Sequence, residues 1–530
     1  MAVASIQKLI NAHRDDYALA ATEKQQQQVK VSQTSSLLAQ LYERVRNAVD
    51  YQEEHLLRKR ALKRIMLRIK SLEKGDSQKL APAIVQEILW AQYMRGYGMP
   101  VAKLRVIAKI VRKYQLLVLG YKHTYRKLPA EATLNRLYAF AAVEIERLLV
   151  PHTAQDAIVD AQFQFLHARK LIPQSALDLQ PAATQLFIAS SRSLIKADDE
   201  MIGYKIFLLK HPFWGNPSKE QFLQLAQLLD TELIEIWEYL DYKLPKSIYK
   251  EVTKYAISFQ ILDKLIVNNL LNAEQVLANE EHTELEVREI CEAEYAENRK
   301  RLHTTIVRSI IYIFITKVFL AVLIEIPYEL IVLKHINWTT LAINIFFPAI
   351  TLFFVANNFS IPNEKNTTQI MQMLRGILFP ELYGNKALTV KVTKPNYSFI
   401  LIFRIFYAIL FLLVIGGIIY LLNLLQFNIA GILIFLVFFS TICFVAMRLR
   451  ATAAELRVVD TRPGVLSPLV DMLSAPILLL GKKLSEGASD LNFFVVILDF
   501  LVEAPFKKII KVFEDWTNYI RETREDIVWP

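Results

Sequence analysis

The stretch TIVRSIIYIFITKVFLAVLIEIPYELIVL (305–333) is long and apolar enough to cross a bilayer, yet it carries charged side chains and a proline. Crossing about 30 Å of hydrocarbon takes roughly 20 helical residues. Its many Ile, Leu, Val and Phe side chains favour insertion more than Lys317, Glu325 and Glu329 oppose it. The stretch therefore predicts a transmembrane helix whose charged groups need partners.

Three more apolar segments of similar length follow, and the joins LKHINW (333–338) and LLQFN (424–428) are very short. Short joins predict two helical hairpins whose outer loops hold no domain. We therefore expect a four-helix polytopic membrane domain within 304–447, with spans at about 308–332, 339–357, 398–424 and 429–447.

Lysine and arginine flank these spans unevenly, since the two outer loops offer only Lys334. By the positive-inside rule, this bias places both termini and the middle loop in the cytoplasm of a multi-pass protein of the cell (inner) membrane. The N-terminal sequence MAVASIQKLINAHRDD lacks the basic and apolar regions of a signal peptide. The inner flanks carry Arg299, Lys300, Arg301, Lys365, Arg375, Lys386, Lys391, Lys394, Arg448, Arg450, Arg457 and Arg462.

Depth distinguishes the polar groups of the spans. Counted from Arg308, Lys317 lies roughly 13 Å deep, Glu325 about 25 Å deep and Glu329 at the outer surface. Lys317 and Glu325 are about 12 Å apart along the axis, so we expect no direct pair within the helix. Asn344 lies near the depth of Glu325, which predicts a hydrogen bond between them. Arg404 is shallow enough to snorkel to the interface.

Composition indicates an all-α fold. Only 14 glycines occur in 530 residues, which disfavours strand-and-turn architectures and phosphate loops. The formal net charge of +10 indicates an anionic partner, for which the membrane surface is the simplest source. The two cysteines fall in a polar helix and in an apolar run, which excludes a disulfide framework.

Residues 1–34, with the run QQQQ, predict a loosely ordered leader. Residues 35–303 predict a cytoplasmic helical bundle or solenoid-like array, with a subdivision at the turn HPFWGNP (211–217). Its last helix starts acidic, ends basic and runs on into the first span.

Two basic helices stand out in this region, at 55–70 and 101–119. Three interpretations remain open: solvated faces of a bundle, a docking surface for anionic lipid, and a nucleic-acid surface that no recognised motif supports. The candidate residues are Arg58, Lys59, Arg60, Lys63, Arg64, Arg68, Lys70, Lys103, Arg105, Lys109, Arg112 and Lys113.

The tail 448–530 predicts cytoplasmic helices associated with the membrane. In 491–522, apolar residues recur at helical spacing while Asp499, Glu503 and Lys507 fall on another stripe. This pattern favours an amphipathic interfacial helix with Trp516 at headgroup level. A re-entrant hairpin through 465–506 is the alternative.

Catalytic, cofactor-binding and metal-binding motifs are absent from the sequence, so we expect no cofactor and disfavour an enzyme. Two functions from different classes remain. The first is a membrane-tethered helical scaffold that binds cytoplasmic proteins. The second is an oligomeric transporter or channel for an ion or small solute that uses Lys317, Glu325, Asn344 and Arg404.

Overall fold

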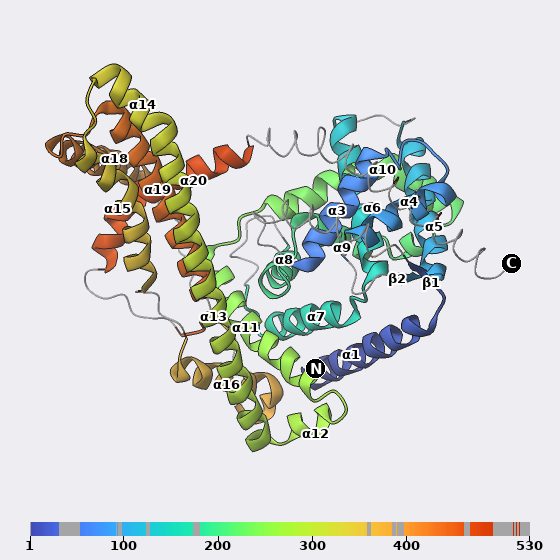
Figure 1. Cartoon of the computed structure of the whole chain (residues 1–530). Coiled ribbons are helices and arrows are strands. Elements are labelled where there is room, and N and C mark those ends of the chain that lie inside the picture. The colour runs from blue at the N-terminus through green and yellow to red at the C-terminus, as the bar shows by residue number, and fades with distance from the viewer. Residues whose placement is uncertain are drawn as a thin grey trace, which may run out of the picture. The chain divides into compact units, whose positions relative to one another are not determined.

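The computed structural model describes residues 2–30, 53–91, 93, 98–122, 128–172, 181–357, 362–383, 388, 397–459, 467–490, 512, 516 and 519. This described part is almost wholly helical (Figure 1), with one antiparallel pair of short strands, β1 (Gln28–Lys30) and β2 (Gly98–Pro100). The all-α prediction is confirmed. The chain forms two compact units: the N-terminal unit (1–278, 375–392 and 497–530) and the membrane unit (279–374 and 393–496).

The N-terminal unit packs its helices around α6 (Ala130–Leu149), whose apolar face is almost completely buried. Helices α3, α5 and α9 lie against it. The other elements of this unit are α1 (Ala2–Gln25), α3 (Glu54–Arg68), α4 (Ser77–Trp90), α5 (Val101–Lys122), α7 (Thr153–Ala168), α8 (Ala182–Leu194), α9 (Asp199–Lys210), η2 (Pro212–Gly215), α10 (Lys219–Asp241), α11 (Lys246–Asn268), α12 (Ala273–Ala278) and α17 (Pro380–Tyr383).

The expected subdivision at 211–217 is wrong. This turn forms the short helix η2, and its Trp214 is completely buried. The indole packs edge-on against Tyr114 of α5 and Phe207 of α9, and it donates a hydrogen bond to Glu144 of α6. The proline and glycine turn therefore anchors the core of a single unit.

The expectation of a loosely ordered leader is also wrong for residues 2–25, which form α1. Ile6, Leu9 and Ile10 are buried at helical spacing, and α1 packs along α7. Arg14 forms a two-pronged ion pair with Glu274 of α12 at 2.7 Å. Tertiary packing thus orders a helix whose polar composition suggested a flexible segment.

Among its described residues, the membrane unit contains four helices long and apolar enough to cross a membrane, as predicted. The first belongs to α13 (Glu280–Leu320), which runs unbroken from a charged start into the apolar stretch. It continues through the π-helix η3 (Ala321–Glu325), α14 (Ile326–Tyr328) and a second π-helix, η4 (Glu329–Leu333). The others are α15 (Trp338–Asn357), α18 (Tyr397–Leu424) and α19 (Ile429–Ala453); α16 (Glu364–Leu378) and α20 (Ser467–Asp490) complete the described helices.

Asn366 of α16 fixes the polar end of α13. Its amide nitrogen donates to the Tyr295 hydroxyl at 2.9 Å and to the Leu456 carbonyl at 2.8 Å. Its amide oxygen accepts from the backbone N–H groups of Val458 and Val459. One buried side chain therefore joins α13, α16 and the segment after α19.

Helix α20 packs closely against α19 at Gly481. A Cβ added to Gly481 would lie 2.1 Å from the Ser440 carbonyl oxygen and 2.9 Å from the Phe444 Cβ, far inside van der Waals contact. Only glycine, which has no side chain, allows this approach. Helix α20 also packs against α18.

Candidate functional site

Lys317, Glu325 and Asn344 form a buried polar cluster within the membrane unit. Lys317 is fully buried, and its Nζ lies 3.0 Å from Glu325 Oε1 and 4.6 Å from the ring centre of Phe438. The Asn344 amide donates to Glu325 Oε2 at 2.8 Å. The predicted Glu325 to Asn344 hydrogen bond across the first hairpin is confirmed.

The expectation that Lys317 and Glu325 cannot pair within one helix is wrong. Eight residues of regular α-helix leave two side chains about 80° apart around the axis. Here five of those residues form the π-helix η3. A π-helix bonds i to i+5 and so holds more residues per turn, which brings Glu325 back toward the face of Lys317. Its side chain also tilts toward the helix N-terminus, and hence toward Lys317.

Glu329 joins the two hairpins, a role that the sequence did not indicate. Its Oε2 accepts from the backbone N–H of Asn337 in the first outer loop, at 3.0 Å. Its Oε1 accepts from the Asn428 amide in the second outer loop, at 2.9 Å. We expected this carboxylate simply at the outer end of the span, but it is buried and satisfied.

Arg404 does not join the buried cluster. It lies on the exposed side of α18, and within the described residues it has no hydrogen-bonding or ion-pair partner. Snorkelling of Arg404 to the interface stays a prediction.

The basic candidates of α3 and α5 do not form one exposed surface. Many of them are used inside the N-terminal unit: Lys59 and Lys63 bind Glu200, Lys59 also binds Asp198, Arg68 binds Glu87, Lys103 binds Glu23, Lys113 binds Glu144, and Arg58 binds Glu146. Arg64 is half-buried. Arg60, Lys70, Arg105, Lys109 and Arg112 remain exposed. Contact of these residues with anionic lipid stays a prediction that flotation with liposomes would test.

Glu146 of α6 lies at the centre of a buried ionic network. It is completely buried, and it accepts from Arg58 Nε at 3.0 Å and binds His152 Nε2 at 2.5 Å. Burial alone would raise the pKa of Glu146, but His152 and Arg58 outweigh it and hold the pKa below its usual value. Burial lowers the pKa of nearby His55.

We expect Glu146→Gln to lower the free energy of unfolding by about 3 kcal/mol at pH 7, because it leaves Arg58 buried without its counter-charge. A carboxylate whose folded pKa is depressed stabilises the protein above its unfolded pKa. That stabilisation is lost as the pH falls from about 4.3 through the folded value. The gap between wild type and variant should therefore shrink below pH 4.3, as measured by thermal melts. A gap independent of pH would contradict the ionised network.

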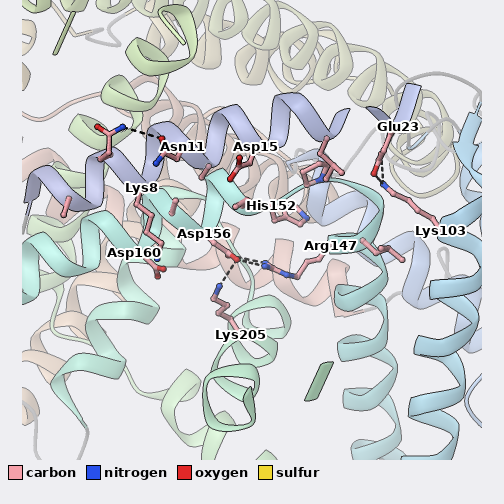
Figure 2. Close-up of a pocket in the computed structure, with 18 residues that line it drawn as sticks. Lys8, Asn11, Asp15, Glu23, Lys103, Arg147, His152, Asp156, Asp160 and Lys205 are labelled. Atoms are coloured by element: carbon pink, nitrogen blue, oxygen red, sulfur yellow. Dashed lines mark hydrogen bonds and ion pairs between the residues drawn. The ribbon is translucent and has the colours of Figure 1, made fainter. Parts of the chain in front are cut away.

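A cleft of about 960 Å³ opens beside this network, between α1 and α7. Figure 2 shows Lys8 and Asp15 on the α1 side and Asp156 and Asp160 on the α7 side. His152 of the buried network also lines it. The cleft was not predicted, because the residues of α1 were expected to form a loosely ordered leader.

Ion pairs organise the walls of the cleft. Asp156 binds Arg147 at 2.5 Å and Lys205 at 2.7 Å, as the dashed lines in Figure 2 indicate. At the other end, Lys103 binds Glu23 at 2.7 Å. Burial raises the pKa of Asp160, against the opposing charge of Lys205. The cleft therefore presents both signs of charge over a short distance.

Within the described ranges, no group of three His, Cys, Asp or Glu side chains lies close enough to share a metal ion. The interfacial-helix residues Asp499, Glu503 and Lys507 lie outside the described residues. Trp516 is described and exposed. The interfacial helix thus stays a prediction.

No protein-family model, curated protein or solved structure matches the chain. Fold and site alone define the class: an all-α protein with four helices long and apolar enough to cross a membrane, and a separate polar helical unit with a charged cleft.

Proposed function

We propose that the protein is a membrane-tethered helical scaffold whose N-terminal unit binds cytoplasmic proteins. The observation that carries this proposal is the internal pairing of the charges in the first span. Lys317 binds Glu325, and Glu329 bridges the two outer loops. Charges that pair with each other stabilise the packing of the membrane helices. A transport pathway instead needs polar groups that face a water-filled cavity.

The proposed topology places both termini in the cytoplasm, as the distribution of Lys and Arg favours. Ser440 lies eleven residues after the start of α19 at Ile429, roughly 16 Å along its axis and near mid-span. Contact of Gly481 with Ser440 therefore supports a re-entrant α20 that reaches mid-depth, in preference to an interfacial position for this helix.

Reconstituted full-length protein tests the scaffold against the transporter. We expect ion and solute leakage from proteoliposomes to equal that of empty vesicles, both for wild type and for the paired variant Lys317→Leu/Glu325→Leu. In cells, cross-linking to other proteins should map to the N-terminal unit. A wild-type flux that disappears in the paired variant, while persisting in the control Gly416→Ala, where an added Cβ meets no atom within 4 Å, would establish transport instead.

A further inference from the structure

Helix α5 turns only part of its positive charge toward the core of the N-terminal unit. The helix contains no Asp or Glu, so any counter-charge comes from another element. Lys103 binds Glu23 of α1 at 2.7 Å. Lys113 binds Glu144 of α6 at 2.5 Å. The charges of these two lysines are therefore neutralised within the unit.

The outward side of α5 carries three more cations. Arg105, Lys109 and Arg112 are exposed, and their side chains form no hydrogen bond or ion pair with any residue whose position the structure describes. Their spacing of four and then three residues places them within about 60° of one another around the helix, over a length of about 10 Å. Three unpaired positive charges therefore lie on one face of a helix that has no acidic residue to offset them.

Apolar side chains continue the same face toward the C-terminal end of α5. Leu116 is 40% exposed and Leu119 is 48% exposed, although both belong to a helix that is otherwise well packed. Cations together with exposed leucines on one helix face are typical of helices that lie at a membrane surface. A nucleic-acid backbone would bind the cations and leave the leucines in water, whereas a lipid surface accommodates both. We call this face the outer stripe; it consists of Arg105, Lys109, Arg112, Leu116 and Leu119.

We propose that the outer stripe of α5 docks on the anionic headgroups of a lipid bilayer. Four helices of the same chain are long and apolar enough to cross a membrane, so a bilayer is a surface that this chain meets. Each basic side chain near an anionic membrane surface favours docking by about fivefold, and three together by about 100-fold. This inference does not depend on the scaffold function, because it concerns lipid and not a protein partner.

Full-length protein in nanodiscs tests the proposal. A fluorophore attached at Leu119→Cys, with Cys291→Ala and Cys443→Ala, reports contact with lipids that carry a nitroxide quencher. We expect strong quenching in phosphatidylcholine with about 30% phosphatidylglycerol, weak quenching in phosphatidylcholine alone, and loss of the difference in about 1 M salt. Both leaflets of these nanodiscs have the same composition, so the result does not depend on which side of the membrane the N-terminal unit faces.

The triple variant Arg105→Gln/Lys109→Gln/Arg112→Gln removes the charge of the outer stripe and retains residues that favour a helix. We expect the ratio of docked to undocked protein in the anionic nanodiscs to fall by about 100-fold, while the melting temperature stays close to that of wild type. Absence of quenching in anionic nanodiscs, equal quenching with and without phosphatidylglycerol, or quenching that the triple variant retains would each overturn the proposal.

The matched control is Lys8→Gln/Lys243→Gln/Lys246→Gln. It removes the same net charge at three exposed positions of the N-terminal unit outside α5, and we expect it to be quenched as strongly as the protein without these changes. Equal loss of quenching in this control would mean that net charge, and not the outer stripe, causes the docking, which also overturns the proposal. Binding of RNA or DNA that requires the three cations, without quenching by lipid, would assign the stripe to nucleic acid instead.

Discussion

We expect Lys317→Leu to destabilise the membrane unit by about 3–5 kcal/mol, because it leaves the Glu325 carboxylate buried without its counter-charge. Glu325 is only 5% exposed and would retain a single neutral donor, the Asn344 amide. The reciprocal change Glu325→Leu should reduce stability by a similar amount, since it leaves the Lys317 ammonium buried without a counter-charge. Thermal melts of the purified variants in detergent, monitored by size-exclusion chromatography, measure the loss of stability in both.

The paired change Lys317→Leu/Glu325→Leu should recover most of the loss, because replacing both buried charges by apolar groups removes the unsatisfied partner. Arg404→Leu is the matched control. It removes an exposed charge that has no partner among the described residues, so its melting temperature should stay close to that of wild type. Additive losses in the paired variant would argue against a direct contact.

Gly481→Val should separate α20 from α19 and destabilise the membrane unit by about 3 kcal/mol or more. The new Cβ would lie 2.1 Å from a backbone carbonyl, and backbone cannot rotate away as a side chain can. Lys482 and Lys483 are exposed on α20, and loss of its packing should let the helix open locally and so raise the rate of tryptic cleavage at both. Melting temperature and the rate of tryptic cleavage at these two lysines report the change.

Gly416→Ala and Gly417→Ala provide the matched controls within α18. A Cβ at either position meets no atom within 4 Å, so both variants should fold as stably as wild type or slightly better. If Gly481→Val melts and is cleaved as these controls are, α20 does not rest on α19 at Gly481.

Depth arithmetic along regular helices predicted the Glu325 to Asn344 hydrogen bond, because the short first hairpin fixes which residues of its two helices lie level. The same arithmetic failed for Lys317, because it assumed a uniform α-helix. The π-helical turn at 321–325 changes the number of residues per turn, and no composition signal distinguishes it from the apolar sequence around it.

Composition also did not predict which side chains are buried or which partners they contact. The basic character of α3 was evident, but Lys59 is 1% exposed and binds two carboxylates far from it in the sequence: Asp198, which caps α9, and Glu200 in its first turn. A single sequence does not reveal such partners. The polar composition of α1 predicted a loosely ordered leader for the same reason, since Ile6, Leu9 and Ile10 form a packing face only against α7.

The sequence by itself determined the all-α class, the four apolar spans and their two short hairpins, because helix periodicity, glycine content and apolar length act locally along the chain. Only the tertiary structure decided which polar groups meet: Lys317 with Glu325, Glu329 with Asn428, and Arg147 and Lys205 with Asp156. Such pairings depend on how close two residues come in the folded structure, and local sequence patterns do not specify this distance. They determine whether a charged side chain is a structural link, a surface group or part of a binding site.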